Sequence, residues 1–171
     1  MTKNLILTGM MGVGKSTVGK NLAKKLSYNF IDIDKIVEFE ENLSVYNIFR
    51  DKGENYFRKI EKKVTLRELK NNSSVISLGG GAFLNKSIRK LVKTSAISFW
   101  LDVNIEKLIL RLKMSKKRPL LIKKNISQTI RKIYLERKKT YNEADHRIVC
   151  NNLKKNEVVE KIYNLYENTR N

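Results

Sequence analysis

The sequence predicts an α/β fold: a five-stranded, mostly parallel sheet with helices on both faces. Three observations lead to this prediction. A glycine-rich loop stands between an apolar segment and a helical pattern, short apolar runs alternate with helical patterns, and no repeat or linker interrupts the alternation. The strands are expected near residues 4–8, 29–33, 74–78, 96–101 and 147–150. A chain of 171 residues suits one domain, 1–171, with one substantial core.

The first expected strand leads into the segment 9–17, which reads GMMGVGKST and fits the pattern G-x-x-x-x-G-K-[ST]. Apolar residues recur behind it at helical spacing. Glycines let such a loop turn its N–H groups inward, and the N-terminus of the next helix adds partial positive charge beneath a polyphosphate. Lys15 is expected to reach the β- and γ-phosphates, and Ser16 to offer a hydroxyl to Mg²⁺. The segment therefore predicts a nucleoside triphosphate site rather than a turn that only starts a helix.

The second expected strand ends at Asp32 and Asp34. Because these aspartates are two residues apart at a strand end, both carboxylates can point to one side. One could organise Mg²⁺ or its water shell, while the other accepts the proton of an acceptor hydroxyl. The alternative is a pair of aspartates that cap the helix expected over 35–41.

The third strand ends in Gly79, Gly80 and Gly81, and the fourth ends at Asp102. A tight turn needs one or two glycines, so three in a row suggest backbone N–H groups that closely approach a ligand. Ligands of open parallel sheets bind beyond the carboxyl ends of the strands. The chemistry at these strand ends is therefore expected to converge on one cleft.

Two further pairs lie at helical spacing. Arg58 and Glu61 are neighbours at i, i+3, either as a surface ion pair of little energy or as a guanidinium held ready for a ligand carboxylate. Arg137 and Tyr141 follow i, i+4 spacing on the helix expected over 127–144. Basic residues on such a helix usually face solvent, so this second pair does not indicate a site by itself.

The segment 113–124 breaks the alternation. It is basic, contains the only proline, Pro119, and follows a helix expected over 105–112. A segment of this kind above a nucleotide cleft is a candidate lid that excludes water on closure. An ordinary charged surface loop is the alternative.

Composition excludes several classes of site. A single cysteine, Cys150, excludes an internal disulfide and a cysteine-based zinc site, and a single histidine, His146, excludes a His-pair metal site. The apolar flanks of Cys150 favour a buried strand position over a nucleophile. No apolar stretch approaches the length of a membrane span or a signal peptide, so the cytoplasm is the expected location.

The net charge of +19 raises the possibility of nucleic-acid binding. The lysines are spread along the chain, however, without a zinc finger, a basic tail or an RNA-binding aromatic pattern. A solvated basic surface, or a field that attracts anionic ligands, therefore remains the favoured explanation.

Together, these motifs resemble those of the shikimate kinase family, in order and spacing, from Leu5 to Cys150. The matching segments are the P-loop in the form G-x-x-G-x-G-K-S-T, Asp32-x-Asp34, Phe57-Arg58-x-x-Glu61, Gly79-Gly80-Gly81-Ala82, Arg118-Pro-Leu-Leu121 and Arg137-x-x-x-Tyr141-x-x-x-Ala144-Asp145. The resemblance implies a three-layer α/β/α P-loop fold with a helical substrate-binding region at about 33–62 and a mobile lid at about 113–124. It also implies transfer of the γ-phosphoryl group of ATP to the 3-hydroxyl of shikimate, with Mg²⁺, on the pathway to chorismate and aromatic amino acids.

Residue roles follow from the same resemblance. Asp34 is implied as the base that also holds the shikimate hydroxyls, with Lys15 and Arg118 as further catalytic groups. Shikimate binding is implied for Asp34, Arg58, Gly79, Gly80, Gly81 and Arg137, and ATP binding for Gly12, Val13, Gly14, Lys15, Ser16, Thr17, Arg111 and Arg118. Ser16 and Asp32 are implied as the metal site. The expected ligands are ATP and shikimate, with no nucleic-acid or membrane partner, and the expected state is a monomer.

The chain departs from the family pattern in two places, at the turn Asn42-Leu-Ser-Val45 and in the segment 151–156, where a frequent glycine and a frequent proline are missing. Adenine contacts beyond Arg111 therefore stay open. The alternatives are another small-molecule P-loop kinase, such as a gluconate-kinase-like protein, a non-catalytic nucleotide-binding regulator of the same fold, and a basic nucleic-acid-binding protein.

Overall fold

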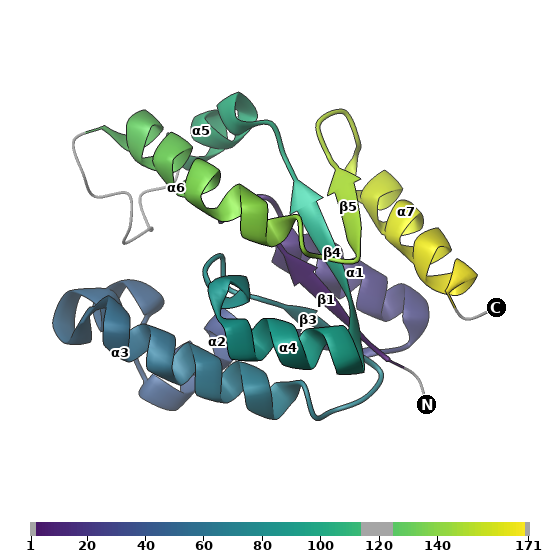
Figure 1. Cartoon of the computed structure of the whole chain (residues 1–171), viewed down its shortest axis with the longest axis horizontal. Helices are drawn as coiled ribbons and strands as arrows, with labels where there is room; N and C mark the ends of the chain where they lie inside the picture. Colours follow the sequence, from purple (N-terminus) through teal and green to yellow (C-terminus); the bar gives the residue numbers. More distant parts are fainter. Residues whose placement is uncertain (1–2, 114–124, 170–171) are drawn as a thin grey trace.

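The computed structural model describes residues 3–113 and 125–169, and its core is a parallel sheet between two layers of helices (Figure 1). The strands are β1 (Asn4–Thr8), β2 (Asn29–Asp32), β3 (Ser74–Ser77), β4 (Ala96–Asp102) and β5 (His146–Val149). The helices are α1 (Lys15–Leu26), α2 (Ile33–Glu41), α3 (Val45–Glu68), α4 (Lys86–Ser95), α5 (Ile105–Lys113), α6 (Ile126–Tyr141) and α7 (Lys155–Asn168), with a short 3₁₀ turn, η1 (Ala82–Leu84). The predicted α/β fold with five parallel strands is confirmed.

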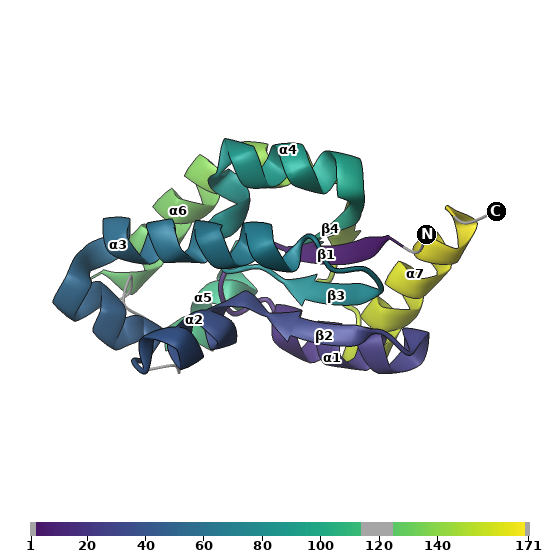
Figure 2. The same ribbon diagram turned by 90° about the horizontal axis from the view of Figure 1, so that it is seen from below.

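The strand order is β2-β3-β1-β4-β5, and every neighbouring pair is parallel. The central strand β1 is buried along its whole length, which explains the apolar run Leu5-Ile6-Leu7 at its centre. Figure 2 shows α3 and α4 on one side of the sheet and α1 on the other, where α1 packs against α7. Because β1 lies between β3 and β4, the loops that follow these strands meet at one edge of the sheet.

The P-loop is packed directly onto that edge. A Cβ at Gly9 would lie 2.6 Å from the carbonyl oxygen of Leu101 in β4, and the φ of Gly9 is +134°. Only glycine combines this close approach with this backbone conformation. The residue that connects β1 to the P-loop therefore has no space for a side chain.

The helices α2 and α3 both begin at side-chain caps. The carboxylate of Asp32 accepts from the backbone N–H of Lys35 at the start of α2, and the hydroxyl of Ser44 accepts from that of Asn47 at the start of α3. Gly53 then interrupts α3 with φ +82° and ψ 167°, a kink that precedes the turns carrying Arg58. The aspartate-cap alternative thus holds for Asp32, in addition to its place at the cleft.

None of the helices within residues 3–113 and 125–169 is both long and apolar enough to cross a membrane. The segment 113–124, interpreted above as a lid, lies outside the described residues except for Lys113, which ends α5.

Candidate active site

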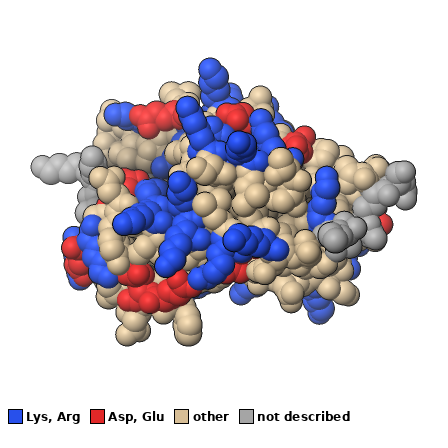
Figure 3. Space-filling view, turned by 60° about the horizontal axis from the view of Figure 1, so that its bottom comes forward, with Lys and Arg blue, Asp and Glu red and all other residues tan. Residues whose placement is uncertain are grey.

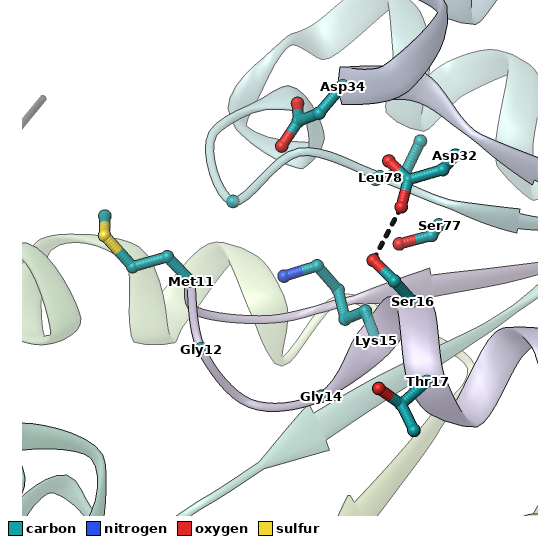
Figure 4. Close-up of a pocket in the computed structure, with 11 residues that line it drawn as sticks. Met11, Gly12, Gly14, Lys15, Ser16, Thr17, Asp32, Asp34, Ser77 and Leu78 are labelled. Carbon is teal, nitrogen blue, oxygen red and sulfur yellow. Dashed lines mark hydrogen bonds between the residues drawn. The ribbon is translucent and has the colours of Figure 1, made fainter. Parts of the chain in front are cut away.

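An open pocket of about 300 Å³ lies at the carboxyl ends of β1, β2 and β3 (Figure 4). The residues that line it come from the P-loop, the start of α1, the junction of β2 with α2, and the end of β3. They are Met11, Gly12, Gly14, Lys15, Ser16, Thr17, Asp32, Asp34, Ser77, Leu78 and Gly80. The convergence predicted from the ends of the first three strands is therefore confirmed.

The P-loop has the backbone that its sequence predicts. Gly12 and Gly14 have φ values of +80° and +99°, and Gly14 is the N-cap of α1. The ammonium group of Lys15 donates to the carbonyl oxygens of Gly9 and Met10, each at 2.9 Å, and its side chain is largely buried. This places a cation and the N-terminus of a helix at the floor of the pocket, where a polyphosphate would be neutralised.

Ser16 and Asp32 are brought together by the first turn of α1 and the end of β2. The Ser16 hydroxyl donates to the Asp32 carboxylate, with 2.6 Å between Oγ and Oδ2 (Figure 4). Hard oxygen donors of this kind suit Mg²⁺, which keeps several waters and phosphate oxygens around one or two protein groups. No group of three or more His, Cys, Asp or Glu side chains that could hold a metal occurs within residues 3–113 and 125–169. The oxygen atoms of Ser16 and Asp32 fit Mg²⁺ as one or two protein ligands.

Ser77 was not selected from the sequence, yet it lines the same pocket at the end of β3, beside Ser16 and Asp32 (Figure 4). A serine in an apolar strand carries no distinctive pattern. Its only signal was its position two residues before the triple glycine, at the strand end where ligands bind.

Asp34 reaches the pocket from the first turn of α2, on the opposite side from Lys15 (Figure 4). The sequence interpretation placed both aspartates at a strand end. In the structure, Asp32 closes the strand and caps the helix, while Asp34 is already helical. Both carboxylates still face one pocket, because the chain turns from strand to helix between them.

The three glycines after β3 each face a different functional group. A Cβ at Gly79 would lie 2.2 Å from the Glu61 carboxylate and 2.7 Å from that of Asp34. A Cβ at Gly81 would lie 2.5 Å from the Arg58 guanidinium. The absence of a Cβ at Gly79 and Gly81 therefore leaves room for the charged side chains packed against them.

Gly80 joins two parts of the site. An added Cβ would lie 3.2 Å from the backbone nitrogen of Met11 in the P-loop and 3.6 Å from Nη1 of Arg137. Gly80 therefore lies between the P-loop and the guanidinium group of Arg137.

Arg58 and Glu61 form the local pair that their spacing predicts, in the part of α3 that follows the kink. Nη1 of Arg58 donates to Oε2 of Glu61 at 2.7 Å, while Nη2 donates to the more exposed Glu54 at 3.0 Å. Glu61 is 2% exposed, and its Oε1 has no hydrogen-bond donor among the described residues. Burial raises the pKa of Glu61 to about 7, against the attraction of Arg58 and with a further increase from Asp34.

Arg137 is buried rather than solvent-facing. It is 7% exposed, and its Nη1 donates to the carbonyl oxygen of Gly80 at 2.9 Å. Since Arg58 contacts Gly81 and Arg137 contacts Gly80, two guanidinium groups from α3 and α6 meet at the glycine loop. Such a pair can hold a carboxylate with several charge-assisted hydrogen bonds.

Two other predicted positions, Asp102 and Arg111, do not line the pocket. Asp102 does not line the pocket, because its carboxylate accepts from Arg147 at 2.6 Å and from Tyr134 at 3.2 Å. This corrects the expectation that the fourth strand end would join the cleft. Arg111 is exposed in the last turn of α5, and Arg118 lies outside the described residues.

Cys150 is buried just after β5, where the loss of hydration raises the pKa of its thiol to about 11. A thiol with such a pKa is protonated at neutral pH and is a poor nucleophile. The expectation that Cys150 is not a nucleophile agrees with this environment.

Comparisons with known proteins match this site to one family. A family model described as shikimate kinase matches residues 11–167 of this chain. Shikimate kinase from Sulfurihydrogenibium sp. (strain YO3AOP1) is 41% identical over 160 residues, which cover 94% of this chain and 95% of that protein. The family-model match begins inside the P-loop and includes the glycine loop and α6.

Among solved structures, shikimate kinase from Acinetobacter baumannii in complex with shikimate superposes with a TM-score of 0.94 at 30% identity, over 99% of this chain and 95% of that one. A gluconokinase from Sinorhizobium meliloti 1021 superposes with a TM-score of 0.56 at 16% identity, over 98% of this chain and 95% of that one. The second likeness reflects the shared fold alone.

Proposed function

This chain belongs to the shikimate kinase family and transfers a phosphoryl group from ATP to shikimate; we propose that it phosphorylates the 3-hydroxyl, with Asp34 as the base. The product, shikimate 3-phosphate, leads towards chorismate and the aromatic amino acids. The observation that carries the proposed residue roles is the glycine loop: Asp34, Arg58 and Arg137 pack against its three glycines, and its Gly80 lies against the P-loop. It offers one acid and two cations to a substrate with one carboxylate and several hydroxyls.

In the proposed reaction, Asp34 accepts the proton of the 3-hydroxyl as the hydroxyl oxygen forms a bond with the γ-phosphorus of ATP. The bond between that phosphorus and the bridging oxygen breaks, and ADP leaves. Phosphoryl transfer depends mainly on positioning and on neutralisation of charge, with little covalent chemistry for the protein to perform. Arg58 and Arg137 would supply the positioning by holding the shikimate carboxylate.

Neutralisation of the phosphate charge is assigned to Lys15 and, by the family resemblance, to Arg118. Ser16 and Asp32 would hold Mg²⁺, which when bound shields the charge of the phosphate oxygens. The P-loop residues Gly12, Val13, Gly14 and Thr17 would complete the phosphate site. Arg111 is proposed to pack against adenine, in agreement with its exposed position on α5.

The finer points of the cellular setting are also proposals. Because ATP is the phosphoryl donor, the enzyme is proposed to act in the cytoplasm. The family resemblance suggests a monomer without a nucleic-acid partner. A single elution volume that corresponds to 20.0 kDa on size-exclusion chromatography would support the monomer.

Production of ADP by the purified protein with MgATP tests the proposal, with shikimate, gluconate and nucleoside monophosphates supplied separately. Turnover of about 1–100 s⁻¹ with shikimate alone is expected, since this is the usual range of kinases. Asp34→Asn should lower kcat by roughly 10²-fold or more while ATP still binds, because the amide cannot accept the proton. Near-normal turnover in that variant would show that Asp34 is not the base. Stimulation by gluconate instead of shikimate would show that Arg58 and Arg137, the proposed carboxylate clamp, bind a different acid.

A further inference from the structure

Tyr141 is a buried side chain that the proposed reaction does not use. It is the last residue of α6, has no exposed surface, and its ring packs against Trp100 with 6.0 Å between centroids. Its hydroxyl donates to the carbonyl oxygen of Gly80. Burial raises the pKa of Tyr141, so the hydroxyl retains its proton and acts as a donor at neutral pH.

The Gly80 carbonyl oxygen receives two donors from the same helix. Nη1 of Arg137 lies 2.9 Å from it, and the Tyr141 hydroxyl is the second donor, one helical turn further along α6. A carbonyl oxygen has two lone pairs, so both donors can bind at once. The same peptide lies against Met11 of the P-loop, as its contacts above show.

The two donors differ in what else they can do. Tyr141 is enclosed in the core beside Trp100, whereas Arg137 has donors beyond the one given to Gly80 and stands beside Arg58 at the glycine loop. If Arg137 were the only donor, its movement towards a substrate would leave the half-buried Gly80 carbonyl oxygen without a donor from the protein, and that loss is unfavourable.

We propose that Tyr141 is a positioning residue for Arg137: its hydroxyl keeps the Gly80 carbonyl satisfied and so leaves the Arg137 guanidinium available to the carboxylate of shikimate. The inference rests on the proposed role of Arg137 in that clamp. It deepens that role by naming the residue that makes Arg137 available.

Tyr141→Phe is the direct test, since it removes the hydroxyl and keeps the ring that packs against Trp100. The KM for shikimate should rise about tenfold, while kcat and the KM for ATP stay within about twofold of the parent values. Tyr134→Phe is the matched control. Tyr134 lies on the same helix, but its hydroxyl donates to Asp102 at 3.2 Å, so this variant should leave the KM for shikimate unchanged.

A double-mutant cycle separates this role from a purely structural one. In an Arg137→Ala background, Tyr141→Phe should change the KM for shikimate by less than about twofold, because no guanidinium remains to be released. An equal effect in both backgrounds, or no effect in either, would overturn the inference while the clamp stands. If Arg137→Ala alone leaves the KM for shikimate unchanged, the clamp itself fails, and the inference fails with it.

A measurement on the unaltered enzyme keeps the proposal testable if Tyr141→Phe folds poorly. With ¹³C in the tyrosine rings and in the glycine carbonyls, saturating shikimate should shift the Gly80 carbonyl resonance as it loses one donor. The Cζ resonance of Tyr141 should also move, as the remaining hydrogen bond strengthens, while that of Tyr134 stays in place. Unchanged Gly80 and Tyr141 resonances at saturation would overturn the proposal.

Discussion

Glu61 shows how one buried carboxylate can organise the side chains around the glycine loop. It holds Arg58 at 2.7 Å, lies against the Cα of Gly79, and shares that position with Asp34. The exposed Glu54 binds the other edge of the same guanidinium. Because only Glu61 is buried, the two carboxylates should behave differently when the pH changes.

The pH dependence of stability follows from the raised pKa of Glu61. Its pKa is about 7 in the folded protein against an ordinary value of 4.5, so between these values the folded state binds a proton that the unfolded state has lost. The contribution of Glu61 to stability is therefore full below pH 4.5 and is lost as the pH rises towards 7. Glu61→Gln cannot ionise, so its stability relative to the parent should improve between pH 4.5 and pH 7.5.

Urea unfolding of both proteins at several pH values measures this difference. Glu38 and Glu41 have lowered pKa values, so their effect on the pH dependence of stability is opposite to that of Glu61. Their contributions are the same in both proteins and cancel when the free energy of unfolding of one protein is subtracted from that of the other. Glu54→Gln is the control, since it alters the same ion-pair network at an exposed position. An equal pH profile for parent and Glu61→Gln would show that folding does not raise the pKa of Glu61.

At the level of elements, the kink in α3 places the functional face of that helix. Gly53 has φ +82° and ψ 167°, a conformation that residues other than glycine almost never adopt. After the kink, Phe57 and Glu61 are buried while Arg58 is half-buried. In a straight helix, the turns before and after residue 53 would share one axis. The kink gives the second part of α3 its own direction, in which it packs against the glycine loop.

Gly53→Ala should therefore lower the free energy of unfolding by about 1–3 kcal/mol, the usual range for such a backbone conformation. A Cβ at Gly53 would meet no atom within 4 Å, so the loss would come from the backbone alone. Chemical denaturation measures it, with Asn55→Ala as the exposed control on the same helix. An unchanged or increased stability for Gly53→Ala would show that the kink relaxes to a helical conformation.

For the whole molecule, charge is the most unusual property. The net charge is +19, and Figure 3 shows Lys and Arg side chains close together on one face, beside a row of Asp and Glu. Several basic residues bind acidic ones, including Arg67 with Glu40 and Arg89 with Glu143. These ion pairs neutralise part of the positive charge on the surface. We therefore expect a general attraction for anions rather than specific binding of nucleic acid in a shaped groove.

Duplex DNA should accordingly bind this protein weakly at low salt, without a saturable stoichiometry, and should be released steeply as the ionic strength rises. Shikimate-dependent turnover at about 150 mM salt should be unaffected by added duplex, because the catalytic pocket does not depend on that surface charge. Fluorescence anisotropy of a labelled duplex across a salt series measures the binding. Saturable binding that persists at 150 mM salt would indicate a nucleic-acid site after all.

The sequence by itself determined the features whose residues are contiguous or one helical turn apart. The P-loop could be predicted because its glycines, Lys15 and Ser16 act through the backbone of one short segment. The pair Arg58 and Glu61 could be predicted as well, since i, i+3 spacing makes two residues neighbours on any helix. Five strands followed from apolar runs in the same way.

Only the tertiary structure decided which distant groups meet. Arg137 and Tyr141 have the pattern of an ordinary helix face, and they are buried because the glycine loop after β3 packs against that face. Asp102 ends a strand like Asp32, yet its carboxylate pairs with Arg147 and does not line the cleft. Helical spacing fixes which side chains share a face, but what covers that face depends on elements far away in the chain, and that information is absent from any local pattern.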